Sequence, residues 1–211
     1  MIIGITGPHR TGKTTLARAY AEKHGVIFLE TSASAVFRSM GLNPAVTYDF
    51  KTRLDVQEKI LEAFEELYKG ASIKTGAITD RTPLDLIAYT MGDAVGDVVP
   101  GDQQQRLSAY VQKCFDVFNK YFSVAVLVPP ALPVVHEEGK AASNQAYIDH
   151  LQMIFRGLLI DERSDVKTFR IDRSCVDIAK RLLSVEVCVK RIEASASEEL
   201  VSLLEKGNRP H

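Results

Sequence analysis

The chain alternates between short stretches that are apolar throughout and longer stretches in which apolar residues recur every three or four positions. The short stretches predict strands at residues 1–6, 26–30, 76–79, 122–128 and 166–171. The longer stretches predict helices at residues 14–24, 53–68, 85–91, 106–121, 145–159 and 174–183. Strands without a polar face that are separated by helices indicate a parallel sheet covered on both sides. We therefore expect an α/β fold with a doubly wound, five-stranded parallel sheet.

The other segments are predicted loops, apart from the chain end. Residues 92–105 are rich in Gly and Asp and contain Pro100, and residues 129–143 begin with two prolines, so both segments are typical of loops. Residues 186–211 are charged and have no evident packing partner. We expect one domain at residues 1–185, followed by a peripheral C-terminal helix and tail at residues 186–211.

Composition and charge exclude several classes of protein. With 26 Lys and Arg against 27 Asp and Glu in 211 residues, the net charge of −1 gives no overall attraction to nucleic acid or to an anionic bilayer. The three cysteines (Cys114, Cys175 and Cys188) lack zinc or disulfide spacing, which favours reduced thiols. The longest apolar run, residues 124–128, is too short to span a membrane. We expect a cytoplasmic protein with no membrane partner.

The first predicted strand leads into a glycine-rich loop that carries the clearest chemical signal. Residues 7–14 read GPHRTGKT and match G-x-x-x-x-G-K-[ST] between a predicted strand and a helix, the context in which this motif forms a P-loop. Backbone N–H groups and the lysine hold phosphates there, and the hydroxyl can hold Mg²⁺. The predicted ligands are ATP and Mg²⁺. The candidate binding residues are Gly7, Arg10, Thr11, Gly12, Lys13, Thr14 and Thr15.

A second motif, DRTPLDLIAY at residues 80–89, follows the third predicted strand. An acid at the carboxyl end of a strand near a P-loop lies where α/β sheets bind ligands, and the planar guanidinium of an arginine suits a phosphate. Asp-Arg followed at this spacing by Ala-Tyr resembles the thymidylate kinase and deoxynucleoside kinase group. The resemblance implies a P-loop kinase in which Asp80 acts near Mg²⁺ and Arg81 handles the acceptor. A surface turn with Asp80 as a helix cap is the alternative.

The same resemblance suggests residues for the acceptor side. Kinases of this group place an acid after their second strand, which implies Glu30 as a catalytic base; the alternative is an ordinary edge charge. Arg53 and Gln57 share one helix face, and a glutamine on such a helix reads the base in deoxynucleoside kinases. A solvated face is the alternative for this pair. Asp85 completes the predicted substrate-binding residues Arg53, Gln57, Arg81 and Asp85.

A kinase also needs a lid that excludes water, because hydrolysis otherwise competes with transfer. We place a helical lid at about residues 129–163. Its proline-rich start and its acidic-Gly-basic turn are similar to the lid of nicotinamide-riboside-type kinases. The resemblance makes Lys140 the lid cation, with Arg156 as second choice.

The prediction is a kinase that moves the γ-phosphoryl of ATP to a nucleoside or nucleotide. The pattern also resembles phage-encoded kinases that act on nucleotides or on hydroxymethylated pyrimidines in DNA. DNA as acceptor would use a local stripe formed by Arg10, Arg18, Lys51 and Arg53. A P-loop ATPase or a nucleotide-sensing module is the alternative outside the kinases. A homodimer remains open.

Overall fold

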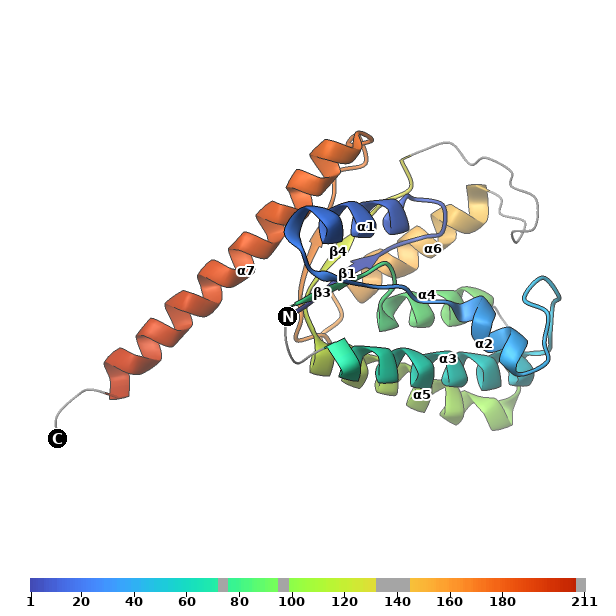
Figure 1. Ribbon diagram of the computed structural model, residues 1–211. Coiled ribbons are helices and arrows are strands. Elements are labelled where there is room, and N and C mark those ends of the chain that lie inside the picture. Colours follow the sequence, from blue (N-terminus) through green and yellow to red (C-terminus); the bar gives the residue numbers. More distant parts are fainter. Residues whose placement is uncertain (72–75, 95–98, 132–144, 208–211) are drawn as a thin grey trace.

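Five parallel strands form the centre of the molecule (Figure 1). The computed structural model describes residues 1–71, 76–94, 99–131 and 145–207, with side chains described up to residue 198. The strands are β1 (Ile2–Thr6), β2 (Ile27–Leu29), β3 (Ala77–Thr79), β4 (Phe122–Leu127) and β5 (Lys167–Arg170). Their order in the sheet is β2-β3-β1-β4-β5, and every pair is parallel. The predicted five-stranded parallel sheet is confirmed.

Helices cover both faces of the sheet. The described helices are α1 (Lys13–His24), α2 (Ala33–Ser39), α3 (Phe50–Ala71), α4 (Pro83–Asp93), α5 (Gly101–Tyr121), α6 (Gln145–Leu158) and α7 (Ile178–Gly207). One core joins Ile2 to helices α3, α4, α5 and α6, and the other joins Ile3 and Ile5 to α1 and α7. Successive strand residues point to opposite faces, so β1 supplies both cores. The fold is therefore doubly wound, as the alternation of strands and helices predicted.

Three elements differ from the prediction. Helix α2 was not predicted, because its seven residues are too few for a clear period, and none of them is fully buried. Helix α5 begins at Gly101, whereas a loop was predicted up to residue 105; Asp102 in its first turn interacts favourably with the helix dipole. Helix α7 is one continuous helix that includes the predicted boundary after residue 185 and extends away from the body of the molecule (Figure 1).

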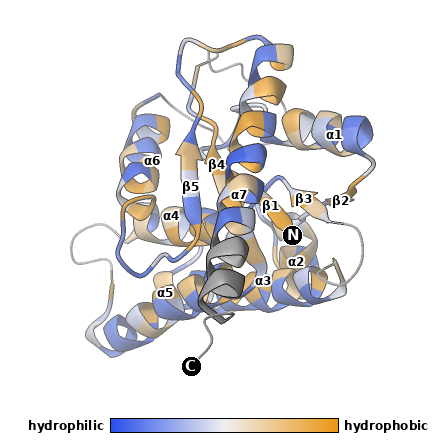
Figure 2. Cartoon of the chain, turned by 90° about the vertical axis from the view of Figure 1, so that its left-hand side faces the viewer, coloured by the Kyte–Doolittle hydropathy of each residue, from blue (hydrophilic) through white to orange (hydrophobic). Residues whose placement is uncertain are grey.

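The two outer strands are less buried than we predicted. Ile27 of β2 is 48% exposed, and only Leu29 of that strand is fully buried. In β5 no residue is fully buried. Central strands β1 and β4 are mostly hydrophobic, whereas β5 carries hydrophilic residues at both ends (Figure 2). An edge strand has a neighbouring strand on one side only, so part of its surface stays exposed even where its residues are apolar. No helix within the described residues is long and apolar enough to cross a bilayer.

Gly4 allows close packing in the middle of β1. A Cβ at this position would lie 2.4 Å from the methyl group of Thr82, a fully buried residue just before α4. The absence of a side chain therefore lets the start of α4 approach the sheet.

We predict that Gly4→Ala lowers the free energy of unfolding by about 1–3 kcal/mol, because overpacking a filled core forces its neighbours to move. Gly70→Ala is the control, since a Cβ there meets nothing within 4 Å and Ala suits a helix better than Gly by about 0.5–1 kcal/mol. Urea denaturation of both variants measures the difference. Equal stabilities would contradict this account of Gly4.

Candidate active site

The P-loop connects β1 to α1, in the place that the motif predicted. Positive φ angles at Gly7 (139°), Arg10 (61°) and Gly12 (85°) turn the backbone around this loop. Gly7 is needed for space as well, because a Cβ there would lie 2.4 Å from the carbonyl oxygen of Val128. Consecutive turns of this kind direct backbone N–H groups toward a common centre, which suits an anion.

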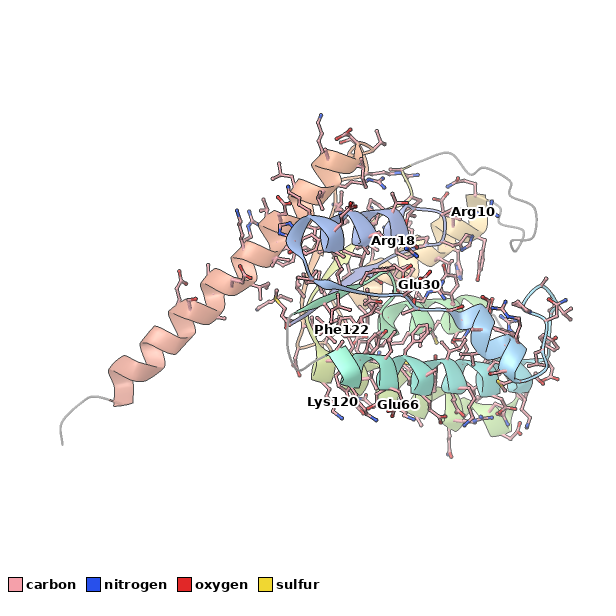
Figure 3. All side chains as sticks on the ribbon, in the orientation of Figure 1. Arg10, Arg18, Glu30, Glu66, Lys120 and Phe122 are labelled. Atoms are coloured by element: carbon pink, nitrogen blue, oxygen red, sulfur yellow. The ribbon has the colours of Figure 1, made fainter. Side chains whose placement is uncertain are left out.

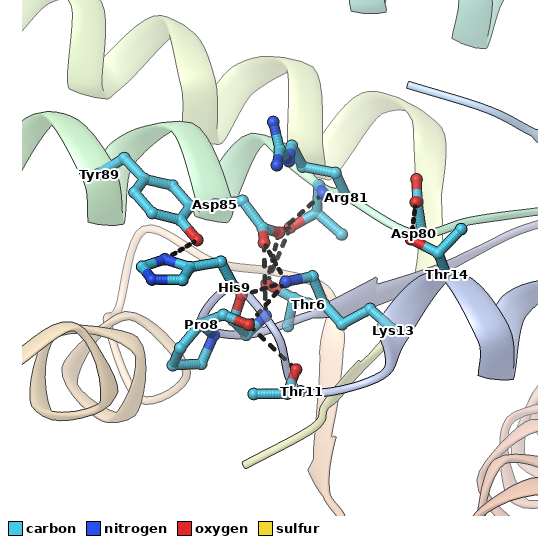
Figure 4. A network of polar contacts seen from close by, with 12 residues as sticks. Thr6, Pro8, His9, Thr11, Lys13, Thr14, Asp80, Arg81, Asp85 and Tyr89 are labelled. Carbon is cyan, nitrogen blue, oxygen red and sulfur yellow. Dashed lines mark hydrogen bonds and ion pairs between the residues drawn. The ribbon is translucent and has the colours of Figure 1, made fainter. Parts of the chain in front are cut away.

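Lys13 bends back over the loop from the first residue of α1. Its Nζ donates hydrogen bonds to the carbonyl oxygens of Gly7 (2.6 Å) and Pro8 (2.9 Å) and lies 3.8 Å from Oδ1 of Asp85 (Figure 4). The side chain is 8% exposed, and burial lowers the pKa of Lys13 to about 8. Three protein oxygens thus surround the Lys13 ammonium group, and the oxygens of a bound phosphate would compete with them for this group.

Asp85 is the hub of the buried polar network in Figure 4. Its Oδ2 accepts from the Thr6 hydroxyl (2.7 Å) and from the Thr82 amide (2.9 Å) and hydroxyl (3.0 Å). Its Oδ1 accepts from the Gly7 amide (3.4 Å). Burial raises the pKa of Asp85, and the nearby charge of Lys13 opposes that shift. We predicted a substrate-binding role, but the side chain is fully buried behind the P-loop and supports the loop instead.

Asp80 and Thr14 meet at the carboxyl edge of the sheet, as the proposed metal site requires. The Thr14 hydroxyl donates to Oδ2 of Asp80 at 2.5 Å, and the Thr31 hydroxyl donates to Oδ1 at 3.0 Å. Mg²⁺ prefers oxygen ligands, and the Thr14 hydroxyl and the Asp80 carboxylate supply such oxygens, so these residues fit the ion. Among the described residues no group of three His, Cys, Asp or Glu side chains could hold a metal. Mg²⁺ here would therefore depend on phosphate oxygens and water for its other ligands.

Arg81 lies beside a cavity of about 690 Å³. Its lining includes His9, Thr31, Ser32, Phe37, Asn43, Gln57, Arg81, Tyr89, Asp93 and Tyr147. The Arg81 guanidinium carbon lies 5.8 Å from the centre of the Tyr89 ring, and no carboxylate in the described part of the chain pairs with it. An arginine without a counter-charge at the wall of a cavity is suited to an anionic ligand.

Three aromatic rings form a group on one side of this cavity. Nδ1 of His9 lies 3.2 Å from the Tyr89 hydroxyl, and the His9 ring centre is 6.0 Å from the ring centres of both Tyr89 and Tyr147. Burial lowers the pKa of His9 to about 4, and the positive charges of Lys13, Arg10 and Arg81 add to this effect. His9 is therefore neutral at neutral pH. Sequence reasoning did not select it, since it is a variable position of the P-loop motif.

Helix α3 contributes the predicted pair Arg53 and Gln57. Gln57 lines the cavity, and its buried Oε1 has no hydrogen-bond partner. Arg53 forms an ion pair with Asp93 of α4, which itself lines the cavity and accepts a hydrogen bond from the Tyr147 hydroxyl at 3.4 Å. Gln57 can thus contact a ligand in the cavity directly. Arg53 is not among the lining residues and instead holds the lining residue Asp93 in an ion pair.

Glu30 does not line the cavity. Its carboxylate is exposed and pairs with the guanidinium of Arg18 on α1 at 2.8 Å, and Figure 3 shows the two residues next to each other. Its neighbour Thr31 lines the cavity and binds Asp80. Successive side chains of an extended segment point to opposite sides, so only one of these two can face the site. The structure gives no support to Glu30 as the base.

The other predicted residues fall into two groups. Thr11 is buried and its hydroxyl donates to the Pro8 carbonyl at 3.0 Å, while Thr15 is exposed in the first turn of α1. Lys140 of the predicted lid lies outside the described residues. Arg156 is exposed on α6, the helix that supplies Tyr147 to the cavity. The lid role of both cations stays a prediction.

The sequence matches known proteins over the part that carries this site. A family model described as an AAA domain matches residues 2–146. Guanylate kinase from Clostridium perfringens (strain SM101 / Type A) is 36% identical over 62 residues, which is 29% of this chain and 29% of that protein. The chain thus matches less than a third of the length of this curated relative.

Solved structures resemble most of the chain, among them two kinases. Deoxyadenosine kinase from M. mycoides, with dCMP and a flexible dCDP bound, gives a TM-score of 0.65 at 17% identity, covering 92% of this chain and 100% of that one. Thymidylate kinase from Candida albicans gives 0.61 at 14% identity, covering 90% and 92%. At these identities the likeness shows the fold, and it confirms the resemblance to P-loop nucleoside and nucleotide kinases at that level.

We predict that Asp85→Ala lowers the free energy of unfolding by about 3–5 kcal/mol, because it leaves the buried Lys13 without its counter-charge and removes the acceptor of four buried hydrogen bonds. Asp116→Ala, an exposed position on α5, is the control and should change stability by less than about 0.5 kcal/mol. Chemical denaturation of both variants tests this. A loss at Asp85 no larger than at Asp116 would show that the network is not structural.

Proposed function

The chain belongs to the AAA-domain family, and we propose that it is an ATP-dependent kinase that transfers the γ-phosphoryl group, with Mg²⁺, to a nucleoside or nucleotide. One observation carries the proposal. Arg81, which pairs with no carboxylate among the described residues, lines a cavity of about 690 Å³ together with His9 of the P-loop. A P-loop explains a nucleotide donor, and the cavity beside it supplies the room for a second ligand of nucleoside size.

On the donor side, the P-loop backbone binds the β- and γ-phosphates. The N–H groups turned inward by Gly7 and Gly12 would donate to phosphate oxygens. Lys13 exchanges the carbonyl oxygens of Gly7 and Pro8 for phosphate oxygens, a change of partners that its flexible side chain permits. Thr14 and Asp80 would hold Mg²⁺, which would neutralise the negative charge of the phosphates during transfer.

On the acceptor side, the cavity combines aromatic walls with a few polar groups. Phe37 and the rings of Tyr89 and Tyr147 can pack against a base. The amide of Gln57 has a buried oxygen without a partner, so it can accept a hydrogen bond from the edge of a base. Arg81 would bind the end of the acceptor that receives the phosphoryl group.

The charges around the cavity favour a nucleotide over a nucleoside as acceptor. A hydroxyl acceptor has to lose a proton, whereas a phosphate oxygen is already ionised at neutral pH. Asp93 is the one carboxylate among the described residues that line the cavity, and Arg53 already pairs with it. Glu30 is turned toward Arg18. Arg81 therefore lies at a cavity wall whose one described carboxylate, Asp93, is already paired, and this suits phosphoryl transfer to a monophosphate, in which positioning and charge neutralisation provide the catalysis.

The alternatives have less support. A P-loop ATPase or a nucleotide-sensing module would not need a second cavity with its own unpaired arginine. A DNA acceptor would need free cations, but Arg18 pairs with Glu30, Lys51 with Asp55, and Arg53 with Asp93. Three members of the predicted basic stripe are thus already neutralised.

Transfer of labelled phosphate from ATP tests the proposal. The acceptor panel contains nucleosides, their monophosphates, nicotinamide riboside and DNA with hydroxymethylated pyrimidines. We expect a labelled nucleoside diphosphate in an amount equal to the ATP consumed, and slow phosphate release without acceptor, since water is poorly aligned in an open site. Fast hydrolysis that no acceptor changes would favour the ATPase, and labelled DNA would favour the DNA kinase.

Arg81→Lys tests the acceptor role of Arg81. Lysine keeps the charge but loses the planar fork that binds a phosphate through two N–H groups, so we predict at least a tenfold loss in kcat/KM for the acceptor. The dissociation constant for ATP should change by less than about threefold, under roughly 0.7 kcal/mol. Calorimetry and acceptor kinetics on one preparation measure both, with Arg170→Lys, an exposed position on β5, as control. Loss of ATP affinity with normal acceptor kinetics would assign Arg81 to the donor site.

A further inference from the structure

Arg181 of α7 reaches the P-loop from the face of the sheet opposite to the acceptor cavity. Its Nη1 donates to the carbonyl oxygen of Thr11 at 2.7 Å, and its Nε donates to the carbonyl oxygen of Cys175 at 2.7 Å. The residue is 2% exposed. One buried side chain thus joins the P-loop to the segment between β5 and α7, although 170 residues separate Arg181 from Thr11.

The positive charge of Arg181 has no partner of opposite sign. Within the described residues no carboxylate lies within ion-pair distance of its guanidinium, and its buried Nη2 has no hydrogen-bond partner. Burial of an uncompensated charge is costly, and most buried arginines are paired. An anion that enters the phosphate-binding loop would supply the counter-charge that Arg181 lacks, so the buried charge favours anion binding.

The contact also fixes the orientation of one peptide group. In a trans peptide the C=O and the following N–H point in opposite directions. Because Arg181 binds the Thr11 oxygen from outside the loop, the N–H of Gly12 points away from Arg181. Gly12 has a φ of 85°, which favours glycine, and a Cβ there would be in van der Waals contact with Nη1 at 3.4 Å, so Arg181 packs directly against this turn.

We propose that Arg181 is a positioning residue of the nucleotide site: it holds the Thr11 carbonyl outward so that the Gly12 N–H faces the phosphates, and its charge is compensated by the bound polyphosphate. This inference rests on the proposed binding of ATP. It adds a residue of the last helix, outside both sequence motifs, to the groups that determine nucleotide affinity.

Two variants separate the contact from the charge. Arg181→Lys keeps the charge but replaces the planar guanidinium, whose Nε and Nη1 bind two separate carbonyl groups, by a single ammonium nitrogen. Arg181→Met removes both the contact and the charge. We expect the dissociation constants for ATP and for inorganic tripolyphosphate to rise by the same factor, about tenfold or more in Arg181→Lys and further in Arg181→Met. Competition against a fluorescent ATP analogue measures both ligands. Arg191→Met, an exposed position on the same helix, is the control and should bind as the wild type does.

If the variants fail to fold, a measurement on the wild-type protein still tests the inference. The Arg181 Nε–H signal in a ¹H–¹⁵N spectrum should be present without ligand, because this proton is buried and bonded, and it should shift when tripolyphosphate is added. An unshifted signal, unchanged affinity in both variants, or weaker binding of ATP but not of tripolyphosphate would each overturn the inference. If the wild type binds neither ligand, the proposed function itself fails.

Discussion

The carboxylate of Asp85 connects the parts on which the whole site depends. Burial of such a group costs several kcal/mol unless hydrogen bonds and an opposite charge compensate it. Its partners are Thr6 at the end of β1, the Gly7 amide of the P-loop, Lys13 at the start of α1, and Thr82 before α4. One arrangement of these four elements satisfies the carboxylate, and this constraint fixes the P-loop relative to α4.

The position of α4 in turn places the two charged residues that precede it. The Arg81 carbonyl accepts hydrogen bonds from the hydroxyls of Tyr68 and Thr79, so the backbone between β3 and α4 is held at its centre. From this fixed backbone Asp80 turns to Thr14 at the proposed metal site, and Arg81 turns to the cavity. The proposed donor and acceptor sides thus separate at the peptide bond between Asp80 and Arg81, which explains why this pair of residues is informative in the sequence.

Local patterns predicted most of the fold and the donor half of the site, and long-range contacts determined the rest. The strands, the P-loop at residues 7–14 and the meeting of Thr14 with Asp80 follow from periodicity and from motifs that lie at strand ends. The sequence did not reveal that Glu30 turns away from the cavity, because its pairing with Arg18 depends on the direction of one side chain after an edge strand. His9 was missed because its partners are aromatic residues of α4 and α6, far along the chain.

The P-loop is held from both layers of the fold, and this determines which of its parts can move. Asp85 binds the amide of Gly7 from the layer that contains α4, and Arg181 binds the carbonyl of Thr11 from the layer that contains α7. Donors fixed before a ligand arrives need no reorganisation when it binds, so a loop anchored at both ends is suited to stabilise charge on a phosphoryl group. Lys13 differs, because its bonds to Gly7 and Pro8 involve carbonyl oxygens within the loop itself. Its side chain can therefore exchange these partners for phosphate oxygens while the backbone keeps its shape.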